Sequence, residues 1–259
     1  MKLAVNLSMI FTEVSLRERF ALAAQHGFQY VEIQFPYELS IEDIQNELTQ
    51  HQLSLCLMNV PAGDLMQGGL GLAGVPGREQ EFKHAVQLAL DYARALNVPS
   101  INILAGKHLE TVDKAECIHT LVHNLQYASE QFAAFQIQPV FEMINGYDMP
   151  GFLIQTVDEA LELLEQVQHP ALKMQYDCYH MARMQENVLG QLQQHIDKIG
   201  HIQFADHPGR HEPGTGELPF TEIFSWLQHS PYSGYVTAEY HPTRLSGQSF
   251  AWQNLIQQN

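Results

Sequence analysis

Four oxygen-bearing side chains stand at the ends of consecutive β-rich runs in the second half of the sequence. They are Glu142 in PVFEM, Asp177 after LKMQY, Gln203 in HIQF and Glu239 in GYVTAE. In a closed barrel of parallel strands, side chains at the carboxyl ends point towards one shared site. Carboxylates buried together disfavour each other's charged forms, and a divalent cation removes that conflict. The pattern therefore predicts a metal site with these four ligands.

The predicted ligand set consists of three carboxylates and one amide, all of which offer oxygen. Hard oxygen ligands suit Mg²⁺ or Mn²⁺ better than zinc, which usually takes His or Cys. We therefore expect one divalent metal ion, Mg²⁺ or Mn²⁺. The alternative is that each acid caps a helix or forms a surface ion pair. That alternative would be favoured for any one acid alone, but four matched positions argue against it.

Two further side chains lie close to these positions in the sequence. His180 follows Asp177 in DCYH and could hydrogen-bond a substrate oxygen. Arg210 lies after Gln203 in the Pro- and Gly-rich run ADHPGRHEPGTGELPF. An arginine in a rigid loop is a candidate clamp for a substrate carboxylate. On spacing alone, a surface ion pair between Arg210 and Glu212 is an equal alternative.

Short β-rich runs alternate with longer amphipathic runs, and these elements must position the candidate residues. We predict strands at Leu3–Leu7, Tyr30–Gln34, Leu53–Met58, Ser100–Leu104, Pro139–Met143, Leu172–Tyr176, His201–Phe204 and Tyr235–Glu239. Apolar residues recurring at three- and four-residue steps predict helices at Leu16–His26, Ile41–His51, Arg78–Leu96, Val112–Phe135, Thr156–Val167 and Val188–Ile199, with weaker patterns at Phe220–Gln228 and near the C-terminus.

This alternation implies parallel strands joined by crossover helices. Eight such units in 259 residues match the size of a closed barrel. We therefore predict the α/β fold class, with a single (β/α)8 barrel. An open doubly wound sheet is the alternative, but NLSMIF follows the first strand where that fold would favour a G-x-G-x-x-G turn. The residue types predict helix caps at Ser40, Thr111 and Thr156 at amino ends and at Gly27 and Gly200 at carboxyl ends.

The segment Pro61–Gly77 contains six glycines and follows the third predicted strand. Glycine weakens both helix and strand, so we expect a loop on the catalytic face of the barrel. A mobile lid is the favoured interpretation, with a long surface loop or a phosphate cradle as alternatives. Other strand-end groups, which would line the pocket or cap the next loop, are Asn6, Glu32 and Asn59.

Charge and composition limit the partners of the protein. The formal net charge is −16, from 13 basic and 29 acidic residues, which argues against binding to nucleic acid or an anionic membrane. The three cysteines form no CxxC pair, so a disulfide framework or thiolate zinc site is not expected. Neither a signal peptide nor a run of about 18 apolar residues is apparent. We expect a cytoplasmic protein, and a homo-oligomer stays open.

Several motifs together resemble the hydroxypyruvate isomerase family of xylose-isomerase-like TIM barrels. They are NLSMIFTEV, GREQEF, FEM, DCYH and HIQFADHPGRHEPGTGE. The resemblance implies one xylose-isomerase-like TIM barrel domain over residues 1–259 and a Glu-Asp-Gln-Glu metal site that matches the four positions above. It also implies that Glu142 and Glu239 form the catalytic acid/base pair. His180 and Arg210 match positions that contact substrate in related barrels.

The activity implied by this resemblance is the interconversion of hydroxypyruvate and tartronate semialdehyde by proton transfer through an enediolate. A 2-oxo-tetronate isomerase or a ketose 3-epimerase could use the same site. A hydride-shift isomerase would need a second metal and further ligands. An endonuclease of this superfamily would need several zinc-binding histidines and a basic surface, against the charge of −16. A non-catalytic barrel that binds a sugar acid is the alternative outside enzymes.

Overall fold

Eight parallel strands form a closed barrel in the order β1 to β8, as predicted. The structure is a computed structural model that describes residues 1–109 and 111–257. Every strand pairs with the next along the chain, and β8 closes the barrel against β1. The strands are β1 (Lys2–Asn6), β2 (Tyr30–Glu32), β3 (Ser54–Asn59), β4 (Ser100–Ile103), β5 (Gln138–Glu142), β6 (Lys173–Asp177), β7 (Ile199–Phe204) and β8 (Tyr235–Ala238).

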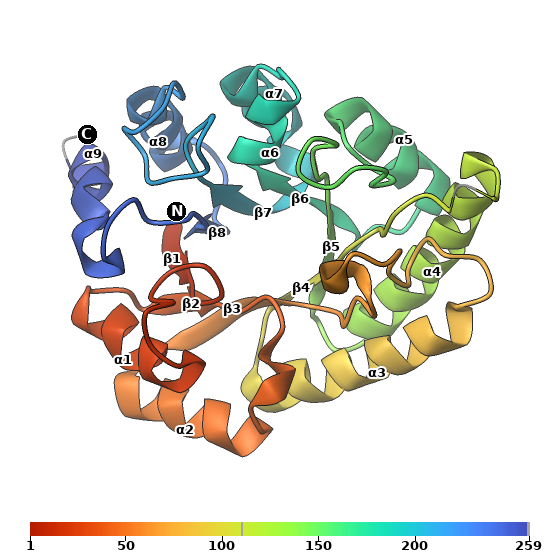
Figure 1. Cartoon of the computed structure of the whole chain (residues 1–259), viewed down its shortest axis with the longest axis horizontal. Coiled ribbons are helices and arrows are strands. Elements are labelled where there is room, and N and C mark those ends of the chain that lie inside the picture. The colour runs from red at the N-terminus through yellow and green to blue at the C-terminus, as the bar shows by residue number, and fades with distance from the viewer. Residues whose placement is uncertain (110, 258–259) are drawn as a thin grey trace.

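Helices surround the barrel as an outer ring (Figure 1). The α-helices are α1 (Leu16–Gln25), α2 (Ile41–His51), α3 (Glu79–Leu96), α4 (Lys114–Ala133), α5 (Val157–Val167), α6 (Cys178–Arg183), α7 (Val188–His195), α8 (Phe220–His229) and α9 (Gln253–Gln257). Among the helices of the described ranges, none is long and apolar enough to cross a membrane.

The apolar spacing of the longer helices accounts for how they pack. In α3, Phe82, Val86 and Ala89 are all at most 1% exposed and lie in the main hydrophobic core. They recur at steps of four and three residues, which place them on one helix face. Burying a side chain such as Phe82 contributes roughly 2 to 3 kcal/mol, so this face holds α3 against the barrel.

The predicted helix ends are confirmed at three of five positions. Ser40 and Thr156 cap α2 and α5 by accepting backbone N–H groups, and Gly27 follows α1 with a φ of +82°. Two predictions were wrong. Asp113 rather than Thr111 caps α4, because its carboxylate accepts the Ala115 N–H.

Gly200 lies inside β7 and is not the end of a helix. The predicted helix at 188–199 stops earlier: α7 ends at His195, and a 3-10 turn covers 196–198. A Cβ atom at position 200 would lie 2.8 Å from Cγ1 of Val140 on β5. Glycine is therefore needed at this position for close packing inside the barrel. The short helix α6 was not predicted, because six residues are too few for a periodic signal.

The glycine-rich segment Pro61–Gly77 is fastened at its base. Arg78 donates to the carbonyl of Gly71 at 2.9 Å and pairs with the carboxylate of Asp64, which also accepts the Gly71 N–H. The carbonyl of the preceding residue, Leu70, accepts the N–H of Lys107 from the loop after β4. The predicted loop is confirmed, and that it acts as a mobile lid stays a prediction.

Candidate functional site

The four predicted ligand positions lie at the carboxyl end of the barrel. Glu142 and Asp177 are the last residues of β5 and β6, Gln203 lies in β7, and Glu239 directly follows β8. Their exposed fractions are 5%, 0%, 1% and 2%, respectively. The parallel register pairs Asp177 with Gln203 across β6 and β7, so the side chains start at matching depths. The structure therefore places all four predicted positions at one end of the barrel, as the sequence predicts.

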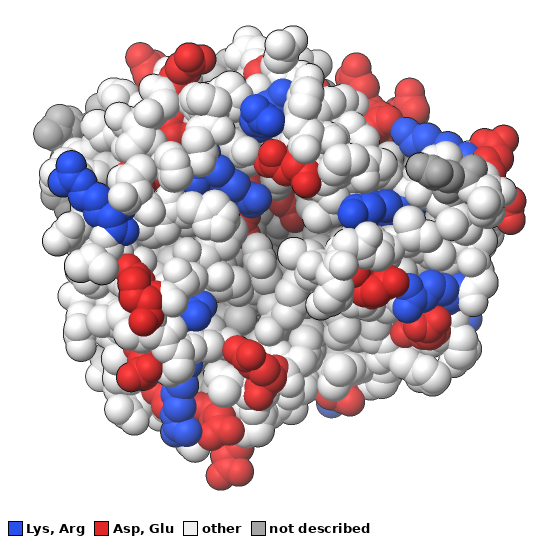
Figure 2. Space-filling view, in the orientation of Figure 1, with Lys and Arg blue, Asp and Glu red and all other residues white. Residues whose placement is uncertain are grey.

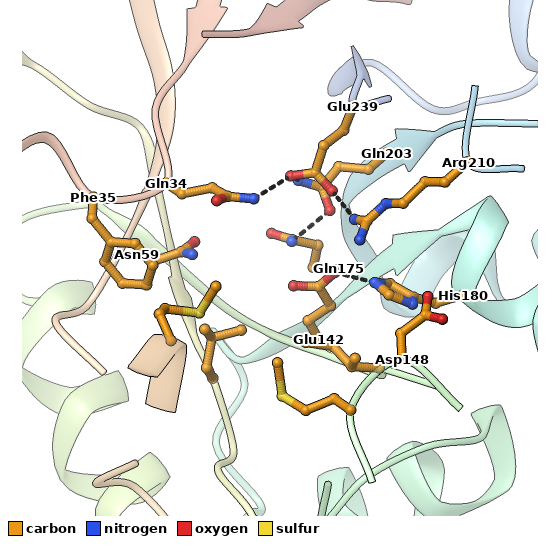
Figure 3. A pocket seen from close by; sticks show the side chains of 14 residues that line it. Gln34, Phe35, Asn59, Glu142, Asp148, Gln175, His180, Gln203, Arg210 and Glu239 are labelled. Carbon is orange, nitrogen blue, oxygen red and sulfur yellow. Dashed lines mark hydrogen bonds and ion pairs between the residues drawn. The ribbon is translucent and has the colours of Figure 1, made fainter. Parts of the chain in front are cut away.

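A cavity of about 160 Å³ opens between these strand ends. Figure 3 shows Glu239, Gln203 and Arg210 along one edge, with Glu142 and His180 facing them and Phe35 and Asn59 at the side. The cavity is thus polar on one part of its wall and apolar on another. The apolar lining comes from Phe35, Met66, Leu104, Ile144 and Met149.

The carboxylate of Glu239 is held by donors on both oxygens. Its Oε1 accepts from the side-chain amides of Asn6 at 2.8 Å, Gln34 at 2.9 Å and Gln203 at 3.0 Å. Its Oε2 accepts from Nη2 of Arg210 at 2.8 Å (Figure 3). Four donors around one carboxylate fix its orientation towards the cavity.

The amide of Gln203 is turned with its nitrogen towards the acids. Nε2 donates to Glu239 and also to Oε1 of Glu32 at 2.5 Å. Oε1 accepts from Nε2 of Gln175 at 2.7 Å. In this orientation the oxygen of Gln203 faces Gln175 and not the cluster of carboxylates. The structure therefore brings Gln203 to the predicted place without presenting its oxygen as a ligand.

Glu142, Asp177 and His180 form a buried group that could hold a metal ion, because one ligand atom from each lies within 4.8 Å of the others. Oδ2 of Asp177 is buried and has no hydrogen-bond partner among the residues that the structure describes. A buried carboxylate oxygen without a hydrogen bond is costly. A divalent cation would supply the missing partner, so the two carboxylates of this group fit a hard metal ion.

Burial and mutual repulsion perturb the acids of the site. Burial raises the pKa of Glu142 well above its usual value, and the charges of Glu239 and Asp177 raise it further. Burial also raises the pKa of Asp177, although Arg210 opposes the change. Burial raises the pKa of Glu239 to about 8, again against the influence of Arg210. Perturbed carboxyl groups that converge on a cavity are typical of active sites.

Arg210 reaches the cavity from the loop between β7 and α8. Its Nη2 lies 2.8 Å from Glu239 and 3.5 Å from Oδ2 of Asp177, and its guanidinium lies over the ring of Tyr179. Burial alone would lower the pKa of Arg210, but Glu239 and Asp177 outweigh it and raise the pKa. The predicted alternative of an ion pair with Glu212 is wrong, because Glu212 instead accepts from Thr243.

A buried carboxylate organises the Arg210 loop. Asp206 accepts four backbone N–H groups, from residues 207 and 218 on Oδ1 and from residues 214 and 216 on Oδ2. The Arg210 N–H donates to the Asp206 carbonyl at 2.9 Å, and Arg210 adopts a left-handed backbone with φ of +56°. This network orients the loop so that the guanidinium of Arg210 lies at the cavity.

His180 lies at the predicted position, in the first turns of α6. Its Nε2 is 3.6 Å from Asp177 and 3.9 Å from Glu142, and its Nδ1 is 2.6 Å from the amide nitrogen of Asn145. Burial and the charge of Arg210 lower the pKa of His180 well below its usual value. The ring is therefore neutral at physiological pH.

Sequence reasoning missed a second layer of polar residues beneath the site. Glu32 was recognised only as a strand-end group, yet it accepts from Asn6 at 2.6 Å, from Gln203, and lies 2.7 Å from Nε2 of His201. A signal was present: Gln175 and His201 each stand two residues before a predicted ligand. Period-two alternation along a strand places such pairs on the same barrel face.

The closed barrel of eight parallel strands is a TIM barrel. Its acid-lined cavity lies at the carboxyl ends of the strands, the face that carries the active sites of TIM-barrel enzymes. The chain belongs to the xylose isomerase-like TIM barrel family, whose sequence model matches residues 20–256.

The chain is similar along its length to curated and solved relatives. It is 41% identical to hydroxypyruvate isomerase of Escherichia coli (strain K12) over 254 residues, covering 98% of each chain. It is 36% identical to 2-oxo-tetronate isomerase of Cupriavidus necator, covering 97% of this chain and 96% of the relative. A crystal structure described as an AP endonuclease, family 2, from Brucella melitensis superposes with a TM-score of 0.94 at 38% identity, covering 98% of both chains.

Proposed function

We propose that this protein is an isomerase that interconverts hydroxypyruvate and tartronate semialdehyde with the help of a divalent metal ion. The observation that carries the proposal is the pair of buried glutamates, Glu142 and Glu239, that line one cavity from different strands (Figure 3). The 41% identity to a hydroxypyruvate isomerase over nearly the whole chain supports the choice of substrate.

The reaction moves a carbonyl group between adjacent carbons by proton transfer. One glutamate takes the proton from the hydroxyl-bearing carbon, which gives an enediolate of the substrate. The other glutamate returns a proton to the neighbouring carbon, while the hydroxyl proton passes from one oxygen to the other. In the metal-free protein, burial raises the pKa of both Glu142 and Glu239, and a carboxylate whose pKa is raised is a stronger base than an ordinary glutamate.

Glu142, Asp177, Gln203 and Glu239 are the residues that we propose to hold Mg²⁺ or Mn²⁺. When bound there, the ion would supply Lewis-acid polarisation of the substrate carbonyl. Gln203 can offer its oxygen only if its amide turns over. Gln175 would have to turn with it, because its Nε2 now donates to that oxygen; its own Oε1, which is buried without a partner among the described residues, would then accept from the turned Gln203 amide.

Arg210 and His180 are the proposed substrate-binding residues. Nε of Arg210 makes no hydrogen bond within the described part of the chain, and the side chain lines the cavity, so its guanidinium has donor capacity left for a substrate carboxylate. Arg210 is also the one cation among the described residues that line the cavity. The anionic end of the substrate would therefore lie near Arg210, and its reacting carbons between the two glutamates.

A 2-oxo-tetronate isomerase or a ketose 3-epimerase is a second candidate, favoured by the 36% identity to a 2-oxo-tetronate isomerase. The apolar wall of the cavity leaves the length of the substrate open. An endonuclease is disfavoured: the net charge is −16, and Figure 2 shows acidic and basic side chains interspersed around the cavity without a basic patch. A barrel that binds a sugar acid without turnover is disfavoured by the presence of both glutamates.

We also propose that the protein acts in the cytoplasm, as the composition predicts. Its cysteines, Cys56, Cys117 and Cys178, are all buried and unpaired, which suits a reducing compartment. A homo-oligomer stays a prediction, as does a single domain over residues 1–259.

A substrate panel tests the proposed function. The protein is stripped with EDTA, supplied with Mg²⁺ or Mn²⁺, and assayed on hydroxypyruvate and on four- and five-carbon 2-oxo acids with a neighbouring hydroxyl group. We expect turnover of hydroxypyruvate only with metal. Faster turnover of a four-carbon acid would identify that acid as the substrate and would leave the proposed mechanism unchanged. No turnover of any of these acids would favour a binding protein.

A further inference from the structure

The side-chain amide of Asn145, just after β5, has an orientation that its backbone neighbours dictate. Its Oδ1 accepts the N–H groups of Tyr147 at 3.1 Å and Asp148 at 2.9 Å. Backbone N–H groups only donate, so the atom that faces them must be the oxygen. The nitrogen of Asn145 therefore points the other way, into the protein.

Two acceptors lie in front of that nitrogen. Nδ2 of Asn145 donates to Oδ2 of Asp148 at 3.0 Å and lies 2.6 Å from Nδ1 of His180. The hydroxyl of Tyr179 also donates to Asp148 at 2.8 Å, which holds the carboxylate in place. The reversed amide would set its oxygen against this carboxylate and its nitrogen against two N–H groups. The two backbone N–H groups and the carboxylate of Asp148 all oppose that reversal.

This orientation decides the protonation of His180. Because the nitrogen of Asn145 donates, Nδ1 of His180 must accept, and the proton of the neutral ring lies on Nε2. Nε2 lies 3.6 Å from Oδ2 of Asp177 and 3.9 Å from Oε1 of Glu142, too far for a hydrogen bond to either. His180 lines the cavity, so this N–H group can donate a hydrogen bond to a bound molecule (Figure 3).

We propose that Asn145 is a positioning residue that fixes His180 as its Nε2–H tautomer, so that His180 donates a hydrogen bond to a substrate oxygen. A nitrogen that carries a proton has no lone pair for a metal ion. His180 is then excluded as a ligand, although it lies close enough to Glu142 and Asp177 to be one. The assignment of the His180 tautomer is independent of the proposed function. The role of His180 in catalysis rests on the proposed function.

The tautomer is measured directly in the metal-free protein. Long-range ¹H–¹⁵N correlation spectra of histidine-labelled protein distinguish a neutral ring protonated at Nε2 from one protonated at Nδ1 and from the imidazolium form. The signal of His180 is assigned by its absence from the spectrum of His180→Gln. We expect the Nε2–H form in the wild type. A proton on Nδ1 in the wild type would overturn the proposal, whatever the activity of the protein.

Asn145→Asp supplies the matched perturbation. Its carboxylate can still accept the N–H groups of Tyr147 and Asp148, but it places an acceptor opposite Nδ1 of His180 and draws a proton there. Asn187→Asp is the control, because Asn187 caps α7 through its Oδ1 and aspartate caps equally well. We expect the His180 signal to change in Asn145→Asp and not in Asn187→Asp. An unchanged His180 signal in a folded Asn145→Asp protein would contradict the proposal.

Kinetics test the role of the N–H group. His180→Gln places an amide nitrogen near the position of Nε2, whereas His180→Asn is too short to reach it. We expect kcat/KM to fall about 10- to 100-fold in Asn145→Asp and in His180→Asn, with partial recovery in His180→Gln. An equal loss of kcat/KM in His180→Gln and His180→Asn would show that His180 does not act as a hydrogen-bond donor to the substrate. Absence of any isomerase activity in the wild type would contradict the proposed function and leave the tautomer measurement standing.

Discussion

Replacement of Glu239 by glutamine should change how the stability of the metal-free protein depends on pH. Burial raises the pKa of Glu239 to about 8, from about 4.5 in the unfolded chain. Folding therefore takes up a proton between these values. The stability from the neutral carboxyl group is fully present below pH 4.5 and is lost as the pH rises through 8.

The size of the effect follows from the shift. One pKa unit corresponds to about 1.36 kcal/mol, so one carboxyl group that protonates on folding lowers the free energy of unfolding by about 3 kcal/mol between pH 5 and pH 7. Glutamine at position 239 has no such proton. Its amide oxygen can accept from Asn6, Gln34 and Gln203 in place of Oε1, but its amide nitrogen then faces Nη2 of Arg210, which costs stability by an amount that does not depend on pH.

The assay is urea unfolding in EDTA at several pH values, followed by tryptophan fluorescence. We expect the wild type to lose about 3 kcal/mol relative to Glu239→Gln from pH 5 to pH 7. Glu222→Gln, at an exposed position on α8, is the control and should follow the wild type. Saturating Mn²⁺ should shrink the difference, because a bound cation favours the ionised carboxylate. A difference that stays constant or changes in the opposite direction would refute this reasoning.

Three other substitutions have expected outcomes of their own. Glu142→Gln should lower kcat about 10³-fold with an unchanged circular dichroism spectrum, and a near-normal rate would remove Glu142 from the acid/base pair. Arg210→Ala should raise KM for hydroxypyruvate about 10- to 100-fold in steady-state assays, because a charge-assisted hydrogen bond is lost; an unchanged KM would mean that Arg210 is not the clamp. Asp206→Asn should lower the free energy of unfolding by about 2 to 3 kcal/mol in urea titrations, because its amide nitrogen would face backbone N–H groups, and full stability would contradict that role.

The positions of the strand-end acids were predictable because they depend on local pattern and topology. Alternating strands and helices imply parallel strands, and a closed barrel brings their carboxyl ends together. Glu142 and Asp177 needed nothing more to be placed at one end of the barrel. The same rule predicts the end of β7. It does not predict the role of Gly200, because nothing in the local sequence shows that Val140 packs against it.

The orientations of the amides were not predictable from the sequence. The direction of Gln203 depends on Glu32 and Gln175, which come from β2 and β6 and are distant in the sequence. The tautomer of His180 depends likewise on Asn145, a residue 35 positions earlier. Such choices are set by donors and acceptors that meet only in the folded barrel, so they require coordinates.

The proton transfer between Glu142 and Glu239 is tested most directly by isomerising hydroxypyruvate in D₂O. We predict that tartronate semialdehyde formed by the metal-loaded protein carries deuterium at the carbon that receives the proton, because the carboxyl groups exchange with solvent, and that EDTA stops its formation. Product that forms without deuterium, or at an undiminished rate in EDTA, would contradict metal-assisted proton transfer by the two glutamates.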